Sequence, residues 1–204
     1  EGIVLGPHEI ADVAHTGSEH GDRYDLVLAD GVTVDPEQFR RNLFTTSSCG
    51  VCGKASIDAV RVAARHLPDG PTLDPAIIAS LPDAMREGQA RFTDSGSIHA
   101  AAAFDPEGSL LAIHEDVGRH NAVDKTVGDL SAHGWPLDPT LLMVSGRISF
   151  EMVQKAAVAG IPVIAGVSGA STLAADLGDE LGMTVIGFLR GSGFNVYSGA
   201  ERIS

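Results

Sequence analysis

The fold is decided by residues 141–190, which read LLMVSGRISFEMVQKAAVAGIPVIAGVSGASTLAADLGDELGMTVIGFLR. Three short apolar runs begin at Leu141, Val163 and Thr184, and segments with helical spacing separate them. The runs show little alternation of polar and apolar residues, which is typical of parallel strands covered on both faces. The stretch therefore predicts an α/β unit of β-α-β-α-β type, with strands at 141–145, 163–167 and 184–189 and helices at 150–159 and 171–181.

The preceding residues add further predicted elements. Residues 98–104 and 110–114 flank an Asp-Pro-Glu-Gly turn and predict a hairpin, which a helix at about 120–132 follows. Two more helices are predicted at 54–66 and in a short piece that ends near Gly88. At the N-terminus we expect a hairpin of 25–28 with 32–34 around Asp30-Gly31. We expect a β-rich remnant at 1–45, truncated because the chain opens within an apolar element without Met, and a main domain at 46–204.

Composition narrows the function classes. The 204 residues are 44% hydrophobic, which is enough for a real core, and they carry a net charge of −13 at pH 7. Such an acidic chain lacks the basic surface that sequence-independent binding to nucleic acid or anionic lipid needs. No apolar run reaches the roughly 18 residues of a transmembrane helix. We expect neither nucleic acid nor a membrane as partner, and any phosphate-bearing ligand has to be held by a local pocket.

The two cysteines stand close together in Cys49-Gly50-Val51-Cys52. This spacing fits a redox or sulfur-handling pair, half of a zinc site, a local disulfide, or two small buried thiols. The pair lies just before the helix predicted at 54–66. Because a helix N-terminus favours an anion, this position lowers the pKa of a thiol and favours the thiolate.

Polar loops follow the predicted parallel strands, at 145–147, 168–171 and 190–193. Ligands bind beyond the carboxyl ends of such strands, so we expect these loops to converge on one edge of the sheet. Arg147 and Arg190 each stand among small residues and offer donors to a phosphate. The last loop is not a Walker or a complete dinucleotide-binding motif, and the alternative is a flexible exit loop.

A dense charged segment at 115–125 marks a junction between a strand and a helix. Asp116 and Arg119 are candidates for ligand contact. For His120, a role in the site and a structural role are both open. The structural alternative is that Asp116 or Asn121 caps the helix, while Glu115, Asp124 and Lys125 are solvated.

His99 lies on an otherwise apolar strand, where a hydrogen-bonded core histidine is the usual explanation. The alternative is a place beside the thiols, as zinc ligand or proton handler. Zinc deaminase chemistry is disfavoured, because Ala101 stands where the catalytic Glu of that signature belongs and the C-x-x-C comes earlier in the chain.

Several motifs occur in one order over residues 45–197, and together they resemble the FdhD family, the formate dehydrogenase accessory sulfurtransferases. The motifs are Ser48-Cys49-Gly50-Val51-Cys52-Gly53, Ile98-His99-Ala100-Ala101, 115–125, Val144-Ser145-Gly146-Arg147-Ile148-Ser149-Phe150-Glu151, Lys155-Ala156, Ala159-Gly160-Ile161-Pro162, Gly187-Phe188-Leu189-Arg190 and Asn195-Val196-Tyr197.

The resemblance implies a three-layer core with a mixed sheet, similar to cytidine deaminases. It implies a cytoplasmic sulfur carrier that takes sulfur from an IscS-type cysteine desulfurase and delivers it to the molybdenum or tungsten bis-guanine-dinucleotide cofactor of formate dehydrogenase. Cys49 is then the persulfide carrier, with Cys52 secondary, and a homodimer is expected. The implied cofactor contacts are Phe188, Leu189, Arg190, Gly191, Ser192 and Gly193, to which the residues themselves add Arg147, Asp116 and Arg119.

Two other functions stay open. One is a zinc-dependent hydrolase that uses Cys49, Cys52 and His99, although we expect no permanent metal. The other is a chaperone that binds the nucleotide cofactor without carrying sulfur.

Overall fold

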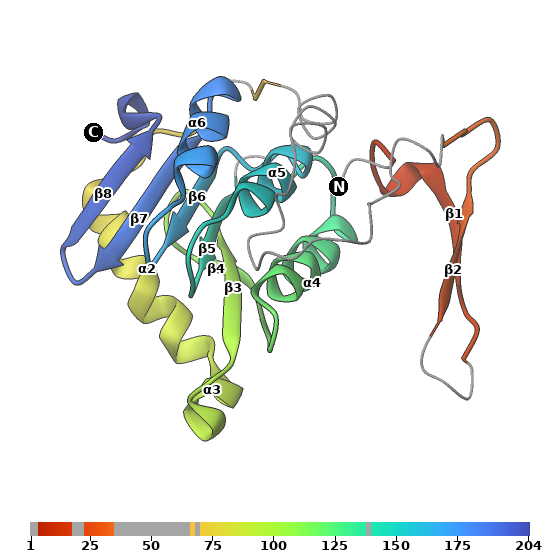
Figure 1. Ribbon diagram of the computed structural model, residues 1–204, viewed down its shortest axis with the longest axis horizontal. Coiled ribbons are helices and arrows are strands. Elements are labelled where there is room, and N and C mark those ends of the chain that lie inside the picture. The colour runs from red at the N-terminus through yellow and green to blue at the C-terminus, as the bar shows by residue number, and fades with distance from the viewer. Residues whose placement is uncertain (1–3, 18–22, 35–65, 68–69, 138–139) are drawn as a thin grey trace.

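A six-stranded mixed sheet forms the centre of the chain in a computed structural model that describes residues 4–17, 23–34, 66–67, 70–137 and 140–204 (Figure 1). The strands, in their order across the sheet, are β4 (Leu110–Asp116), β3 (His99–Phe104), β5 (Leu141–Val144), β6 (Val163–Gly166), β7 (Thr184–Arg190) and β8 (Gly193–Ser198).

The middle of this sheet is parallel. Leu141 pairs with Val163 and Val163 with Thr184, so β5, β6 and β7 run in one direction, as the sequence predicts. Every residue of β5 and β6 is buried, which explains why these strands carry apolar side chains without alternation. The predicted hairpin of β3 and β4 is also confirmed, and β3 runs antiparallel to both β4 and β5.

Helices cover both faces of the sheet and complete three layers (Figure 1). One core cluster takes Leu142 and Val144 of β5 and joins them to helices α4, α5 and α6. The other takes Leu141 and Met143 and packs them against α2. The predicted fold class, an α/β three-layer core with a mixed sheet, is confirmed. The helices are α2 (Pro75–Gly88), α3 (Ala90–Ser95), α4 (Arg119–Ser131), α5 (Phe150–Val158) and α6 (Thr172–Glu180), with short 3-10 turns at Pro7–Glu9 and Ala200–Arg202.

Helix α2 begins where Asp74 accepts a hydrogen bond from the backbone N–H of Ala76 at 2.7 Å, and Pro75 occupies the first turn. Its buried face consists of Ile78, Leu81 and Met85. The short helix α3, which the sequence analysis did not predict, follows directly and ends at Gly96 with a φ of 63°. These two helices set the wall of a cavity described below.

The N-terminal hairpin pairs differently from the prediction. Strand β2 (Tyr24–Leu28) lies antiparallel to β1 (Ile10–His15), with Val13 opposite Leu26, and residues 32–34 form no strand. Asp30-Gly31 is a turn as expected, but the three residues after it offer a shorter partner than the six residues of β1. The hairpin stands apart from the main sheet at the right of Figure 1.

Three predictions fall outside the described residues. They are the helix at 54–66 except for its last residue, the domain boundary at 45/46, and the positions of Cys49 and Cys52. Within the part that the structure does describe, no helix is long and apolar enough to cross a bilayer.

A buried hydroxyl links α4 to the sheet and provides a stability prediction. Thr126 is fully buried, and its Oγ1 donates to the carbonyl oxygen of Ala101 on β3 at 2.9 Å. Thr126→Val keeps the shape and removes the donor, so we expect it to lower the free energy of unfolding by about 1 kcal/mol in a denaturant titration. Thr93→Val, at an exposed threonine of α3, is the matched control and should change stability by less than about half of that. Equal effects at the two sites would contradict the importance of the Thr126 bond.

Candidate functional site

The carboxyl ends of β4, β5, β6 and β7 meet along one edge of the sheet, which we call the loop edge. Since β3 and β8 run the other way, their first residues, His99 and Gly193, lie at the same edge. Backbone hydrogen bonds from Phe188 to the Ser168 carbonyl at 3.0 Å, and from Ile148 to the Gly169 carbonyl at 3.1 Å, tie the loops together. The predicted convergence of the three polar loops is confirmed.

Arg190 is exposed at this edge, and a hydrogen bond to the backbone of the adjacent loop holds its side chain. Its Nε donates to the carbonyl oxygen of Val167, just beyond β6, at 3.0 Å. This bond uses Nε, and within the part of the chain that the structure describes the two terminal nitrogens stay available to a ligand. Arg147 is also exposed in the loop after β5. The loop edge thus presents guanidinium groups that suit an anion.

Phe188 has an unusual backbone for a bulky residue. Its φ is 53°, and it lies at a bulge where β7 carries one more residue than β8. The side chain is 47% exposed, and its ring lies so close to Gly169 that a Cβ there would stand 2.9 Å from Cζ. The bulge therefore turns an aromatic ring out of the core and onto the loop edge.

The residues on either side of Arg190 take different places. Leu189 is fully buried in the core cluster beneath α2, so its side chain is not available to a ligand and only its backbone could contribute. Gly191 and Ser192 form a two-residue turn between β7 and β8, with a φ of 55° at Gly191. The segment expected either as a phosphate loop or as a flexible exit is thus the exposed tip of a hairpin, and β8 was not predicted.

Asp116 at the end of β4 is surrounded by donors. Its Oδ2 lies 2.6 Å from Nζ of Lys125, and its Oδ1 accepts from the N–H of Gly118 at 2.8 Å and from Asn121 at 3.1 Å. The Lys125 hydrogen bond is the main reason why the pKa of Asp116 falls from 3.8 to about 2. The structural alternative, in which Asp116 or Asn121 caps the helix, is wrong, because the N-cap of α4 is Gly118 and, among the described residues, no side chain caps it. Asp116 instead binds the N–H of Gly118 and the side chain of Asn121 just before and within the first turn. A ligand amino group would have to compete with these partners.

We expect Lys125→Met to raise the pKa of Asp116 from about 2 towards 3.8, because it removes the largest favourable interaction of the carboxylate. Since the pKa is depressed in the folded state, the resulting stability is present above about pH 4 and is lost as the pH falls towards 2. Carboxyl NMR titration measures the shift. Lys155→Met is the matched control, because Lys155 pairs with Asp124 at 2.6 Å instead. An Asp116 pKa that is the same in both variants would contradict this assignment.

Glu115 is not simply solvated, as the structural alternative for the charged segment assumed. Its two carboxylate oxygens accept from the backbone N–H groups of Arg91 and Phe92, each at 2.8 Å. Glu115 thereby satisfies the free donors at the start of α3. It fixes α3 against the sheet.

His99 is partly exposed at the loop edge and is therefore not a buried core histidine. Its Nδ1 lies 3.4 Å from Oγ of Ser145, which in turn accepts from the N–H of Ala100 at 2.9 Å. A Cβ on Gly146 would lie 3.4 Å from the His99 ring and 3.8 Å from Cδ of Arg119. These are ordinary van der Waals distances, so His99 and Arg119 both lie beside the loop after β5.

A second polar cluster joins α4 and α5. Nε2 of His120 lies 3.3 Å from Oγ of Ser149 and 3.4 Å from Glu151, and Ser149 donates to Glu151 at 2.8 Å. Because the hydroxyl of Ser149 is directed to a carboxylate, the cluster does not have the order of a serine nucleophile and its base. Glu151 had no predicted role, and only its spacing from Ser149 could have indicated this contact.

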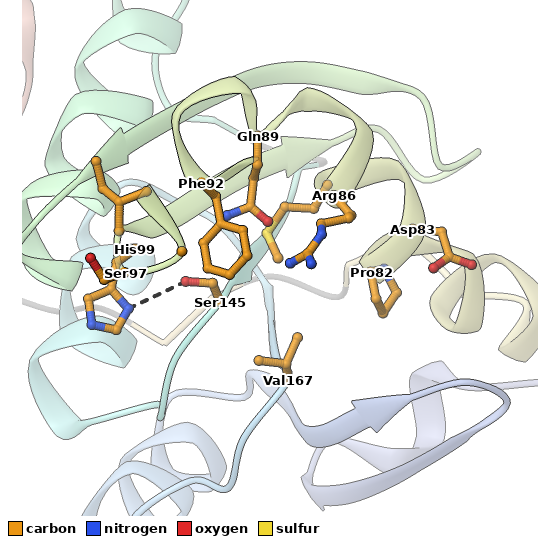
Figure 2. Close-up of a pocket in the computed structure, with 12 residues that line it drawn as sticks. Pro82, Asp83, Arg86, Gln89, Phe92, Ser97, His99, Ser145 and Val167 are labelled. Carbon is orange, nitrogen blue, oxygen red and sulfur yellow. Dashed lines mark hydrogen bonds between the residues drawn. The ribbon is translucent and has the colours of Figure 1, made fainter. Parts of the chain in front are cut away.

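A cavity of about 770 Å³ opens between α2, α3 and the loop edge (Figure 2). Its lining includes Arg86, Gln89, Phe92, His99, Ser145 and Val167. Of these residues, the sequence indicates a site role only for His99 and for the loop that begins at Ser145. The other members come from α2 and α3, whose packing against the sheet has no local signature.

The described residues contain no group of three or more His, Cys, Asp or Glu side chains that could hold a metal. The trio proposed for a zinc hydrolase includes Cys49 and Cys52, which lie outside those residues, so this alternative stays a prediction.

Comparison with known proteins identifies the family. The sequence model of the FdhD/NarQ family matches residues 1–204. The sulfur carrier protein FdhD of Streptomyces avermitilis is 49% identical over 214 residues, covering 100% of this chain and 76% of the relative. That of Mycobacterium tuberculosis is 44% identical over 219 residues, covering 100% and 78%. The crystal structure of a proposed formate dehydrogenase accessory protein from Desulfotalea psychrophila has the same fold, with a TM-score of 0.72, 24% identity and coverage of 98% and 74%. The chain therefore belongs to the FdhD/NarQ family.

Proposed function

We propose that this chain is a sulfur carrier that serves formate dehydrogenase. One observation carries the proposal: the chain matches the FdhD/NarQ family over its whole length. Relatives at 44–49% identity are sulfur carrier proteins, and the pair Cys49 and Cys52 is present, which supports it. A thiol is the group that carries sulfur between proteins, as a persulfide.

In the first step, sulfur arrives from an IscS-type cysteine desulfurase. The Cys49 thiolate attacks the outer sulfur of the desulfurase persulfide, so that a new S–S bond forms on Cys49 and the desulfurase cysteine leaves as a thiolate. The exchange needs no external oxidant, because one S–S bond replaces another. A moderately lowered thiol pKa serves this step best, since it raises the thiolate fraction while nucleophilicity is retained.

In the second step, Cys52 releases the sulfur. Attack of the Cys52 thiolate on Sγ of Cys49 forms a Cys49–Cys52 disulfide and expels the outer sulfur as sulfide, which the metal of the cofactor takes up as a ligand. Two thiols are thereby oxidised and one sulfur is reduced, so the electrons balance. A cellular thiol then reduces the disulfide before the next cycle.

The substrate that receives the sulfur is a molybdenum or tungsten bis-guanine-dinucleotide cofactor. Arg190, Arg147 and Arg119 at the loop edge are suited to its phosphates, and the exposed ring of Phe188 to one of its flat rings. The net charge of −13 does not oppose this, because charges more than about 8–10 Å from the ligand are screened at physiological salt. The proposal includes a cytoplasmic location and a homodimer.

Complementation tests the sulfur-carrier role. In a strain that lacks its own carrier, we expect the chain to restore formate dehydrogenase activity and a variant with both cysteines changed to alanine to restore none. Full activity with the double variant would favour the cofactor chaperone instead. Stoichiometric zinc in the purified protein, by metal analysis, would favour the hydrolase.

A further inference from the structure

The imidazole of His99 at the loop edge has one ring nitrogen bonded and the other open (Figure 2). Its Nδ1 lies 3.4 Å from Oγ of Ser145, and among the described residues Nε2 has no hydrogen-bond partner. We infer that His99 donates the proton with which the outer sulfur leaves Cys49, and that Ser145 positions the imidazole for this step. The inference rests on the proposed function, because it concerns the sulfide that the second step expels.

The release of sulfide needs a proton. When the Cys52 thiolate attacks Sγ of Cys49, the electron pair of the bond to the outer sulfur moves onto that sulfur. The outer sulfur of a persulfide is already negative at neutral pH, so without a proton it would leave as the dianion S²⁻. A leaving group of high basicity departs slowly. A proton donor converts the leaving group to HS⁻ and lowers this barrier.

The step is balanced in atoms and electrons. The S–S bond between Cys49 and Cys52 forms, the bond to the outer sulfur breaks, and the Nε2 proton of the His99 imidazolium passes to the leaving sulfur. The two cysteine sulfurs together lose two electrons and the outer sulfur gains two, so the step needs no other oxidant or reductant. The neutral imidazole takes up a proton from water before the next cycle.

Ser145 determines which nitrogen of His99 exchanges the proton. Its Oγ accepts from the N–H of Ala100 at 2.9 Å, and a hydroxyl oxygen has a second lone pair for Nδ1–H of His99. Nδ1 then keeps its proton in both the neutral and the charged ring, and Nε2 is the nitrogen that gains and loses one. The backbone N–H of Ser145 also donates to the Ala100 carbonyl at 3.0 Å, so the ends of β3 and β5 hold the pair in place.

The other acidic and imidazole groups of the loop edge are engaged within the described structure. Asp116 accepts hydrogen bonds at both oxygens, and its pKa of about 2 leaves no proton to donate at neutral pH. Both oxygens of Glu115 accept from backbone N–H groups. Nε2 of His120 lies 3.4 Å from the carboxylate of Glu151. His99, in contrast, combines an open nitrogen with a side chain that changes charge near neutral pH.

Charged groups of both signs surround His99. Asp116 is its partner across the β3–β4 pair, and this carboxylate favours the imidazolium. Arginines favour the neutral ring. Because these charges act in opposite directions, they leave the ring able to accept and to donate a proton. The charged residues near His99 are Asp116 of β4, Arg119 of α4, Arg147 in the loop after β5, and Asp83 and Arg86 of α2.

Single-turnover release of sulfide tests the inference. Each chain is loaded with an IscS-type desulfurase and cysteine, separated from both, and the sulfide that it releases is measured between pH 6 and pH 9. We expect His99→Gln to load sulfur as the native chain does but to release it about a hundredfold more slowly at pH 6. The difference should shrink towards pH 9, where the native histidine has also lost its proton. His133→Gln, at an exposed histidine beyond the far end of α4, is the matched control and should release sulfide at the native rate.

Added imidazole gives a readout that a purely structural role of His99 would not change. In His99→Ala, we expect free imidazole to speed release by about tenfold at pH 6, because it supplies the missing proton donor. The same addition should leave His133→Ala unaffected. Ser145→Ala should slow release by about tenfold at pH 6 while the dependence on pH is kept, since the donor is present but no longer oriented.

Four results would overturn the inference and leave the sulfur-carrier function standing. They are native release by His99→Gln at pH 6, a loss that is the same at every pH, no effect of imidazole on His99→Ala, and failure of His99→Gln to load sulfur. A native chain that loads no sulfur on Cys49 would instead overturn the proposed function, and this inference with it.

Discussion

Cys49→Ala is expected to abolish the acquisition of sulfur by this chain. The outer sulfur of a desulfurase persulfide is transferred only when a thiolate attacks it, and alanine has no atom that can form the new S–S bond. After incubation with an IscS-type desulfurase and cysteine, mass spectrometry of the intact native chain should show an adduct of one sulfur atom that maps to Cys49. The variant should show none.

Cys52→Ala is the matched control, because it removes the other thiol of the same motif. We expect this variant to load sulfur on Cys49 as the native chain does but to fail in releasing it, since no neighbouring thiol can displace the sulfur as sulfide. Undiminished loading of the Cys49→Ala chain would refute the assignment of the carrier. Loss of loading in both variants would show that the two thiols act together in the first step.

The parallel half of the fold could be predicted because its signals are local and strong. Strands buried on both faces have to be apolar throughout, and three such runs between helical segments leave few alternatives to a β-α-β-α-β unit. The elements β5, α5, β6, α6 and β7 accordingly lie within one or two residues of their predicted bounds. Because these elements are buried in the core, their residues have to be apolar, and the sequence therefore shows where they lie.

The antiparallel edges were harder to predict, because their partners are chosen by contacts distant in the chain. The sequence predicts that residues 25–28 pair with the nearest apolar run, 32–34, whereas their partner in the structure is β1, which lies earlier in the chain. The sequence does not predict strand β8, because Gly191, Ser192 and Gly193 resemble a loop, although Gly191 and Ser192 form the turn of a tight hairpin. Glycine indicates a turn, but it does not indicate whether a paired strand follows that turn.

At the site, residue types were easier to predict than their partners. The three polar loops converge because parallel strands must end at a common edge. The sequence does not show, however, that Lys125 forms a salt bridge with Asp116 or that Glu115 accepts hydrogen bonds from the first turn of α3. Nor does it show that Leu189 is buried. These outcomes depend on which side chain is nearest after packing. The cavity that Gln89 lines depends on packing even more, since its walls come from α2, α3 and the ends of three strands, β3, β5 and β6.

Arg190→Ala is expected to weaken the binding of GDP, a probe with a guanine ring and two phosphates, by about tenfold to a hundredfold. Hydrogen bonds to charged groups contribute about 1.5–3 kcal/mol, and about 1.4 kcal/mol corresponds to a factor of ten in affinity. The Nε bond to Val167 holds the guanidinium at the loop edge before a ligand arrives, so little side-chain freedom is lost on binding. Calorimetric titration at physiological salt gives the two affinities.

Arg23→Ala controls for the loss of one positive charge, because Arg23 is exposed beside the N-terminal hairpin, where it pairs with Asp25 at 3.0 Å. Its removal should leave GDP affinity within about twofold, since charges more than roughly 10 Å apart are screened in salt. For the native chain, added salt should weaken GDP binding, and for Arg190→Ala the dependence on salt should be smaller. If Arg190→Ala and Arg23→Ala bound GDP equally well, Arg190 would not bind the phosphates. An acidic chain would then need another local source of positive charge for them. Arg147 and Arg119 would be the next residues to replace.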